Sequence, residues 1–104
     1  MGIVLETKEF EKSWNALRFA NTSLKHNHEV KVFLMGEAVE CLVLDHVKYD
    51  IQAEIAIFTD NGGIMLACGT CLKSRNQSAT DGCPLSTMND CVEMVEWADK
   101  VLTF

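Results

Sequence analysis

Short apolar runs alternate with segments of helical periodicity along this chain, and this alternation constrains the fold more than any other sequence feature. Apolar, β-rich runs occur at residues 3–5, 30–35, 64–67 and 100–104, with helical or turn-rich sequence between them. Strands that alternate with helices pair in parallel, because each connecting helix returns across a face of the sheet. We therefore expect an α/β fold whose parallel sheet is covered by helices on both faces.

Helical spacing and capping residues predict longer helices between these runs. Thr7 can cap the first helix, which is expected to run to about His26. Its apolar face comprises Phe10, Trp14, Leu17 and Leu24. A second helix is expected over residues 51–58, because apolar residues recur there at helical spacing and an Asn-Gly-Gly stop follows at 61–63.

The last helix is expected to begin after Ser86 or Thr87, either of which can act as its N-cap. One side of this helix is apolar and comprises Met88, Cys91, Val92, Val95 and Ala98. Residues 37–44 are compatible with a short helix or an irregular crossover. Residues 72–76 are expected to form a short helix, and residues 77–82 an exposed loop.

The length and composition indicate one compact domain. The chain has 104 residues, of which 48% are apolar and 23% charged, and we expect a single domain over 1–104. No apolar run approaches the ~18 residues needed to cross a bilayer. The apolar segment at the start is also too short for a signal peptide, because a charged residue follows it within a few positions. We therefore expect a cytoplasmic protein without a membrane anchor. The net charge is −6 and the basic residues are scattered, which argues against nucleic-acid binding.

Five cysteines are the unusual feature of the composition, and two of them, Cys68 and Cys71, form a C-x-x-C motif. An odd count without a secretion signal argues against a disulfide framework, and a close pair in a cytosolic chain indicates metal or redox chemistry. Cys68 directly follows the apolar run at 64–67, where a strand is expected to end and a helix to begin. Unpaired N–H groups and the helix dipole at such a position stabilise a thiolate. This arrangement suits a nucleophilic sulfur that attacks or carries another sulfur atom.

Four neighbouring residues complete the candidate catalytic site around the two cysteines. They are Gly69, Thr70, Lys73 and Arg75. Gly69 lets the backbone turn tightly and leaves space beside the sulfur. Lys73 and Arg75 are cations close in sequence to the pair, and either could stabilise a persulfide anion on it.

Two alternatives remain open from the cysteine spacing. Cys68, Cys71, Cys83 and Cys91 follow the pattern C-x2-C-x11-C-x7-C and could supply four thiolates to a zinc ion. Against this interpretation, only the first pair is close, and Cys91 falls on the apolar side of the last helix. Cys41 is likewise expected in the core. The second alternative is a dithiol redox protein, although the motif here follows a late strand and opens only a short helix.

Several segments carry a resemblance that covers nearly the whole chain. The earlier ones are Ile3-Val4-Leu5-Glu6-Thr7, Trp14-Asn15-Ala16-Leu17-Arg18-Phe19-Ala20 and His28-Glu29-Val30-Lys31-Val32-Phe33-Leu34-Met35-Gly36-Glu37. The later ones are Asn61-Gly62-Gly63, Ala67-Cys68-Gly69-Thr70-Cys71 and Ala98-Asp99-Lys100-Val101-Leu102-Thr103-Phe104. Together they resemble the DsrE/DsrF-like family of sulfur-relay proteins, which includes the TusD type.

The resemblance implies a three-layer sandwich of about five mostly parallel strands, similar to flavodoxin-like and Rossmann-like folds, that assembles as a homotrimer or homohexamer. It also implies that Cys68 carries sulfur as a persulfide between a donor and an acceptor protein, as a sulfurtransferase-like carrier without a cofactor. The TusD type has no cysteine at the position of Cys71, which is typical of a short branch bearing C-x-x-C. Cys71 could therefore be a resolving thiol, or it could signal metal binding.

Overall fold

The computed structural model describes residues 1–80 and 82–104. The strands are β1 Gly2–Leu5, β2 Lys31–Leu34, β3 Ile64–Cys68, β4 Leu85–Ser86 and β5 Val101–Thr103. The helices are α1 Phe10–Lys25, the 3-10 helix η1 Gly36–Leu42, α2 Ile51–Asp60, α3 Gly69–Ser74 and α4 Met88–Trp97. Within this described part of the chain, no helix combines the length and the apolarity needed to span a bilayer.

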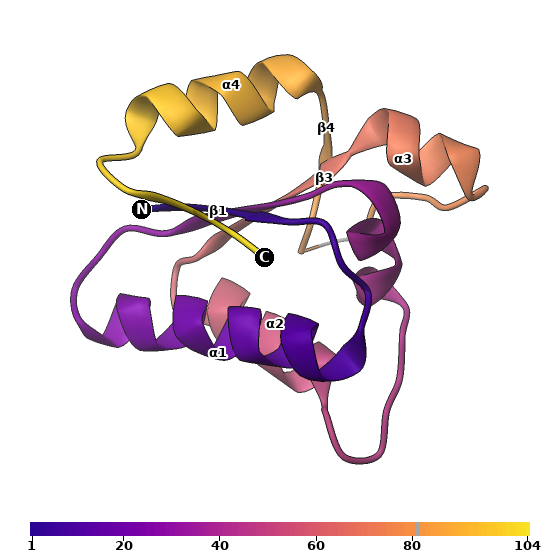
Figure 1. The fold of residues 1–104 in the computed structure, drawn as a ribbon, viewed down its shortest axis with the longest axis horizontal. Helices are drawn as coiled ribbons and strands as arrows, with labels where there is room; N and C mark the ends of the chain where they lie inside the picture. Colours follow the sequence, from indigo (N-terminus) through magenta and orange to yellow (C-terminus); the bar gives the residue numbers. More distant parts are fainter. Residues whose placement is uncertain (81) are drawn as a thin grey trace.

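The strands form one five-stranded parallel sheet in the order β4-β3-β2-β1-β5. The central strand is β2, and Leu34 of β2 lies opposite Leu5 of β1 on one side and Ala67 of β3 on the other. Figure 1 shows α1 and α2 on one face of the sheet and α4 on the other. The expected α/β fold with helices on both faces is therefore confirmed, and the sheet is entirely parallel.

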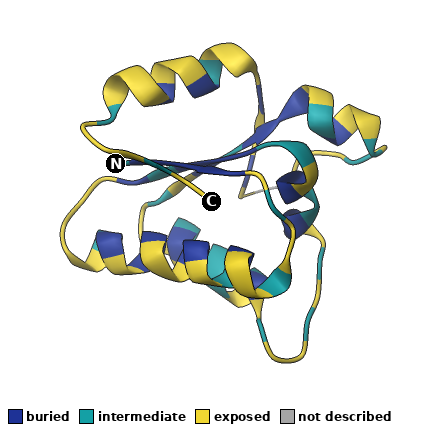
Figure 2. Ribbon diagram, viewed as in Figure 1, coloured by how far each residue is buried: buried dark blue, intermediate teal, exposed yellow. Residues whose placement is uncertain are grey.

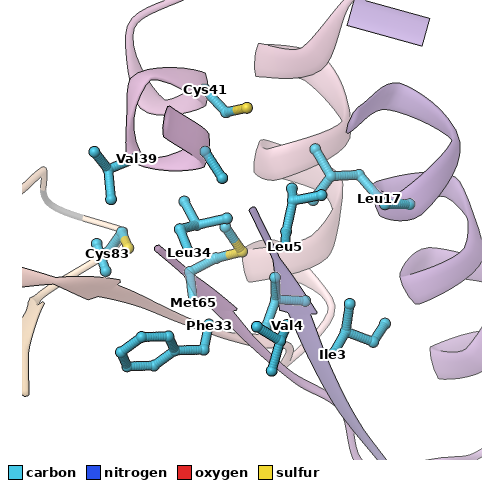
Figure 3. Packing of buried hydrophobic residues seen from close by; sticks show 14 of the residues in the cluster. Ile3, Val4, Leu5, Leu17, Phe33, Leu34, Val39, Cys41, Met65 and Cys83 are labelled. Atoms are coloured by element: carbon cyan, nitrogen blue, oxygen red, sulfur yellow. The ribbon is translucent and has the colours of Figure 1, made fainter. Parts of the chain in front are cut away.

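The hydrophobic core is centred on β1 and β2, which are buried along almost their whole length (Figure 2). Strands covered by helices on both faces are apolar at consecutive positions, which explains the uninterrupted apolar runs in the sequence. Figure 3 shows Leu5, Leu34 and Met65 of three adjacent strands together with the side chains of Cys41 and Cys83. These two cysteines are fully buried members of the core.

The beginning of α1 differs from the sequence expectation. Glu9, not Thr7, is the N-cap, and its carboxylate accepts the backbone N–H groups of Glu11 and Lys12 at 3.1 and 2.9 Å. The Thr7 hydroxyl instead accepts the N–H of Glu9 at 3.1 Å. The carboxylate reaches two free donors of the first turn, so it replaces the hydroxyl at the cap and Thr7 supports the turn before it.

The segment around β4 also departs from the expectation. Ser86 belongs to β4, a two-residue strand that the sequence analysis missed because it is too short to show a period. Thr87 is the N-cap of α4, and it forms a reciprocal capping box with Asp90. α3 begins at Gly69, directly after β3, instead of near Leu72. The strand and the helix therefore join without a loop, which fixes the first cysteine at their junction.

The apolar side expected for α4 is only partly buried. Cys91 and Met94 face the sheet and are buried, whereas Met88 is 54% and Val92 52% exposed, and Val95 is exposed as well. Among the described residues, α4 is the one long helix on its face of the sheet (Figure 1), and no other described helix covers its flank. An apolar strip on this helix therefore faces solvent in the single chain.

Candidate functional site

The candidate site lies at the carboxyl ends of β2 and β3. Cys68 is the last residue of β3 and also the N-cap of α3, and Cys71 lies in the first turn of that helix. Both thiols are free; Cys68 is 5% exposed and Cys71 is half-buried. The N-cap and the third helical residue are positions whose side chains meet in helix caps, so the two thiols are held on the same side of the junction.

The sulfur of Cys71 also has a backbone partner from the next strand. The N–H of Gly36 donates to Cys71 Sγ at 3.2 Å. Gly36 follows the end of β2 and has a φ of 59°, a left-handed conformation that glycine adopts without strain. β2 and β3 pair in register up to Leu34 and Ala67, and this pairing brings the two strand ends together. The sequence analysis did not identify Gly36, because a backbone donor has no side-chain signature.

The electrostatics of the pair keep the proton on Cys71. Burial raises the pKa of Cys71, and a hydrogen bond with the Cys68 side chain raises it further, whereas the Gly36 N–H lowers it. Cys71 is therefore a thiol in contact with Cys68. Its pKa is sensitive to the single backbone donor that contacts it.

A depression of about 390 Å³ opens beside these sulfurs, with a mainly apolar wall. It is lined by Cys68, Gly69, Thr70, Cys71, Lys73, Leu85, Ser86, Thr87 and Met88. A Cβ atom at Gly69 would overlap Leu85 Cδ2 and lie 3.2 Å from the carbonyl oxygen of Ser86. Gly69 therefore lets β4 pack closely against the start of α3 and form one side of the depression.

The two expected cations have different surroundings. Lys73 is exposed and lines the depression. Arg75 is engaged elsewhere: its Nε donates to Glu40 Oε2 at 2.9 Å and its Nη1 donates to the carbonyl oxygen of Cys71 at 3.2 Å. Lys8 adds a second ion pair to Glu40 at 3.4 Å. Arg75 thus joins α3 to η1, and Lys73 is the better placed of the two to meet an anion in the depression.

The tertiary structure places Glu40 between two cations, Arg75 and Lys8. The hydrogen bond from Arg75 lowers the pKa of its carboxyl group, and Lys8 contributes in the same direction. Glu40 and Arg75 are 35 positions apart, so their pairing has no local sequence signature. In the structure the Glu40 carboxylate is therefore bound by two cations.

The other cysteines lie in environments that suppress ionisation. Burial raises the pKa of Cys83 to about 12, and it also raises the pKa of Cys41 and Cys91. A metal site requires thiolates, so burial disfavours the third and fourth ligands of the zinc alternative. Among residues 1–80 and 82–104, no three His, Cys, Asp or Glu side chains are grouped so that they could hold a metal ion.

A second, larger depression of about 470 Å³ lies at the amino ends of β2 and β3. Lys31, Ile64 and Trp97 contribute to its wall, and it contains no cysteine. Its volume exceeds that of the depression beside Cys68, but its described lining includes no thiol. The chemistry of the residues therefore favours the smaller depression as the functional site.

Comparison with known proteins supports the same assignment of fold and family. The model of the DsrE/DsrF-like family matches residues 2–104. Protein MJ0989 of Methanocaldococcus jannaschii is 30% identical over 90% of this chain and 88% of its own length. Escherichia coli YchN is 32% identical over 90% of this chain and 87% of its own length. The crystal structure of E. coli YchN superposes with a TM-score of 0.87, covering 99% of this chain and 97% of that one at 27% identity.

Proposed function

Because the chain belongs to the DsrE/DsrF-like family, we propose that it is a cytoplasmic sulfur-relay protein that carries sulfur as a persulfide on Cys68. The observation that carries this proposal is the position of Cys68 at the end of β3, beside an open depression and within contact of a second thiol. All five cysteines are free, as expected in a reducing compartment.

The transfer requires two thiol exchanges. The Cys68 thiolate attacks the outer sulfur of a donor protein's persulfide, forms a new S–S bond and releases the donor thiolate. A thiolate of the acceptor protein then attacks the outer sulfur on Cys68, and Cys68 leaves as a thiolate. Lys73 on the wall of the depression stabilises the persulfide anion in between. No net oxidation occurs, so the relay needs neither a cofactor nor a metal.

Mass spectrometry of the intact protein after treatment with inorganic polysulfide tests this function. The wild-type protein is expected to gain sulfur that Cys68→Ser does not gain, because serine provides no thiolate. Cys91→Ser is the matched control, since Cys91 is also a buried cysteine but lies outside the depression. Equal uptake by Cys68→Ser and the wild-type protein would overturn the proposal.

The exposed apolar strip on α4 supports assembly with further copies of this chain. Met88 belongs both to this strip and to the wall of the depression, and the exposed Leu85 of β4 lies on the same wall. A subunit packed on the strip would therefore border the Cys68 site and restrict which partners reach it. The strip supports self-association, and the DsrE/DsrF-like family implies the number of subunits, so we propose a homotrimer or homohexamer.

Light scattering after size-exclusion chromatography tests the assembly. Val92→Glu places a charge on the exposed strip and is expected to shift the protein toward the monomer, because the carboxylate would lose its water at the interface. Glu93→Gln is the control on the neighbouring exposed position. An unchanged mass for Val92→Glu would place the interface elsewhere.

A further inference from the structure

Cys71 holds a position that a simple carrier does not need. Its sulfur contacts Cys68 and accepts the Gly36 N–H at 3.2 Å, and Arg75 fixes its carbonyl group. Resting on the persulfide function proposed for Cys68, we infer that Cys71, activated by the Gly36 amide, releases the carried sulfur as sulfide. The site would then reduce persulfide sulfur in addition to passing it on.

The step is a thiol–disulfide exchange within one helix cap. The Cys71 thiol loses its proton to water, and its thiolate attacks the inner sulfur of the persulfide, Cys68 Sγ. The Cys68–Cys71 disulfide forms, the S–S bond of the persulfide breaks, and the outer sulfur leaves as HS⁻. The outer sulfur is reduced by two electrons, and the two cysteine sulfurs supply them. A dithiol reductant then returns the disulfide to two thiols.

The geometry of the strand-to-helix junction makes this exchange local. Side chains three residues apart on a helix are neighbours, with Cβ atoms separated by about 5–6 Å, whereas a disulfide requires about 3.5–4.5 Å. Cys68 and Cys71 have this spacing, and both lie on the wall of the same depression. The exchange therefore needs rotation of the two side chains and a small closing movement of the first turn of α3, without a change in the pairing of the strands.

The Gly36 amide supplies the charge stabilisation that the attacking sulfur needs. Burial keeps Cys71 protonated, so the step is limited by the fraction of thiolate. The N–H of Gly36 points at Cys71 Sγ in the resting protein and remains a donor when the sulfur ionises. Because the donor belongs to the backbone at the end of β2, the fold holds it in place before any sulfur arrives.

A pH jump under anaerobic conditions tests this inference. The wild-type protein, Cys68→Ser and Cys71→Ser are loaded with inorganic polysulfide at mildly acidic pH and freed of excess reagent. They are then brought to mildly alkaline pH, where the thiolate fraction of Cys71 is larger. Sulfide is measured with a fluorogenic probe, and the cysteines are alkylated and mapped. Trypsin cleaves after Lys48 and Lys73, which isolates Cys68 and Cys71 in one peptide without other cysteines.

We expect the wild-type protein to release one sulfide per loaded chain and to yield this peptide two hydrogens lighter than its reduced form. Cys71→Ser should keep its added sulfur and release none, and Cys71→Ala provides a second variant in case the serine disturbs the fold. A wild-type protein that retains its persulfide as long as Cys71→Ser would overturn the inference. Failure of Cys71→Ser to load sulfur on Cys68 would instead overturn the carrier function.

Discussion

The cysteines of this protein occupy two regions with opposite properties. Cys68 and Cys71 lie at the carboxyl edge of the sheet, on the wall of a depression of about 390 Å³, and the Gly36 N–H donates to Cys71 Sγ. Cys41 and Cys83 lie among apolar side chains of the core (Figure 3) and are fully buried. The same side chain is thus a candidate nucleophile in one region and a small hydrophobic residue in the other. Access and hydrogen-bond donors separate the two roles, and the residue type does not.

Serine substitution in each region should separate these roles most strongly. Cys68→Ser is expected to abolish sulfur uptake while leaving the fold intact, because serine is similar in size to cysteine and the residue borders the depression. Cys83→Ser should keep the uptake and lower the free energy of unfolding by about 1–3 kcal/mol, because a hydroxyl is buried among apolar groups. Intact mass and urea unfolding at a fixed protein concentration measure the two effects. If Cys83→Ser lost uptake without losing stability, the division between the regions would be wrong.

The sequence predicts the strands of the core and the position of the two thiols, but it does not predict the contacts that complete the site. Apolar runs reveal strands buried on both faces, so β1, β2 and β3 were predictable, and the C-x-x-C after the third run located the two thiols. The remaining parts of the site come from long-range contacts. The Gly36 N–H reaches Cys71 over 35 positions, and Glu40 reaches Arg75 over the same separation. No local pattern records such pairs, because the register of the parallel strands creates them.

Losing the backbone donor at Gly36 is expected to have the next largest effect, on the rate of sulfide release. Gly36→Val should displace the N–H from Cys71 Sγ, because a β-branched residue does not fit a φ of 59°. Losing this hydrogen bond raises the pKa of Cys71 and removes a donor to the attacking thiolate. A hydrogen bond to a charged group contributes about 1.5 kcal/mol or more, so sulfide release should slow by roughly tenfold. The pH dependence of alkylation at Cys71 should also move upward, which loss of packing alone would not produce.

The matched variant at this position is Gly36→Asn. Asparagine already adopts positive φ in this chain at residues 27 and 76, and a Cβ at Gly36 would meet only the carbonyl oxygen of Glu6 at 3.8 Å. This variant is therefore expected to keep the donor, the sulfide release rate and the alkylation profile. Equal slowing in both variants would show that the amide does not activate Cys71.

The stability of the protein at alkaline pH tests the properties assigned to the core cysteine Cys83. Burial raises the pKa of Cys83 from 9.0 to about 12, so the folded protein holds this proton while the unfolded chain releases it. The stabilisation is complete below pH 9.0 and declines as the pH rises toward 12, by up to about 1.4 kcal/mol per pH unit. Cys83→Ala should lose less stability over this range in urea unfolding. Parallel curves for the two proteins would contradict the assigned burial effect.

Removing the contact between Glu40 and Arg75 is expected to have the smallest effect on the rate of sulfide release. Arg75→Ala removes both the ion pair and the hydrogen bond to the Cys71 carbonyl group, so Cys71 is positioned less firmly. Both side chains are partly exposed, and pairs of this kind contribute little, so sulfide release should slow by only about two- to threefold. Glu40→Gln retains a neutral acceptor for Arg75 and should have a smaller effect still. Added salt should weaken the ion pair in the wild-type protein and narrow the difference from Arg75→Ala. A tenfold loss in Arg75→Ala at high salt would instead mean that Arg75 acts on the sulfur itself, as a second cation beside Lys73.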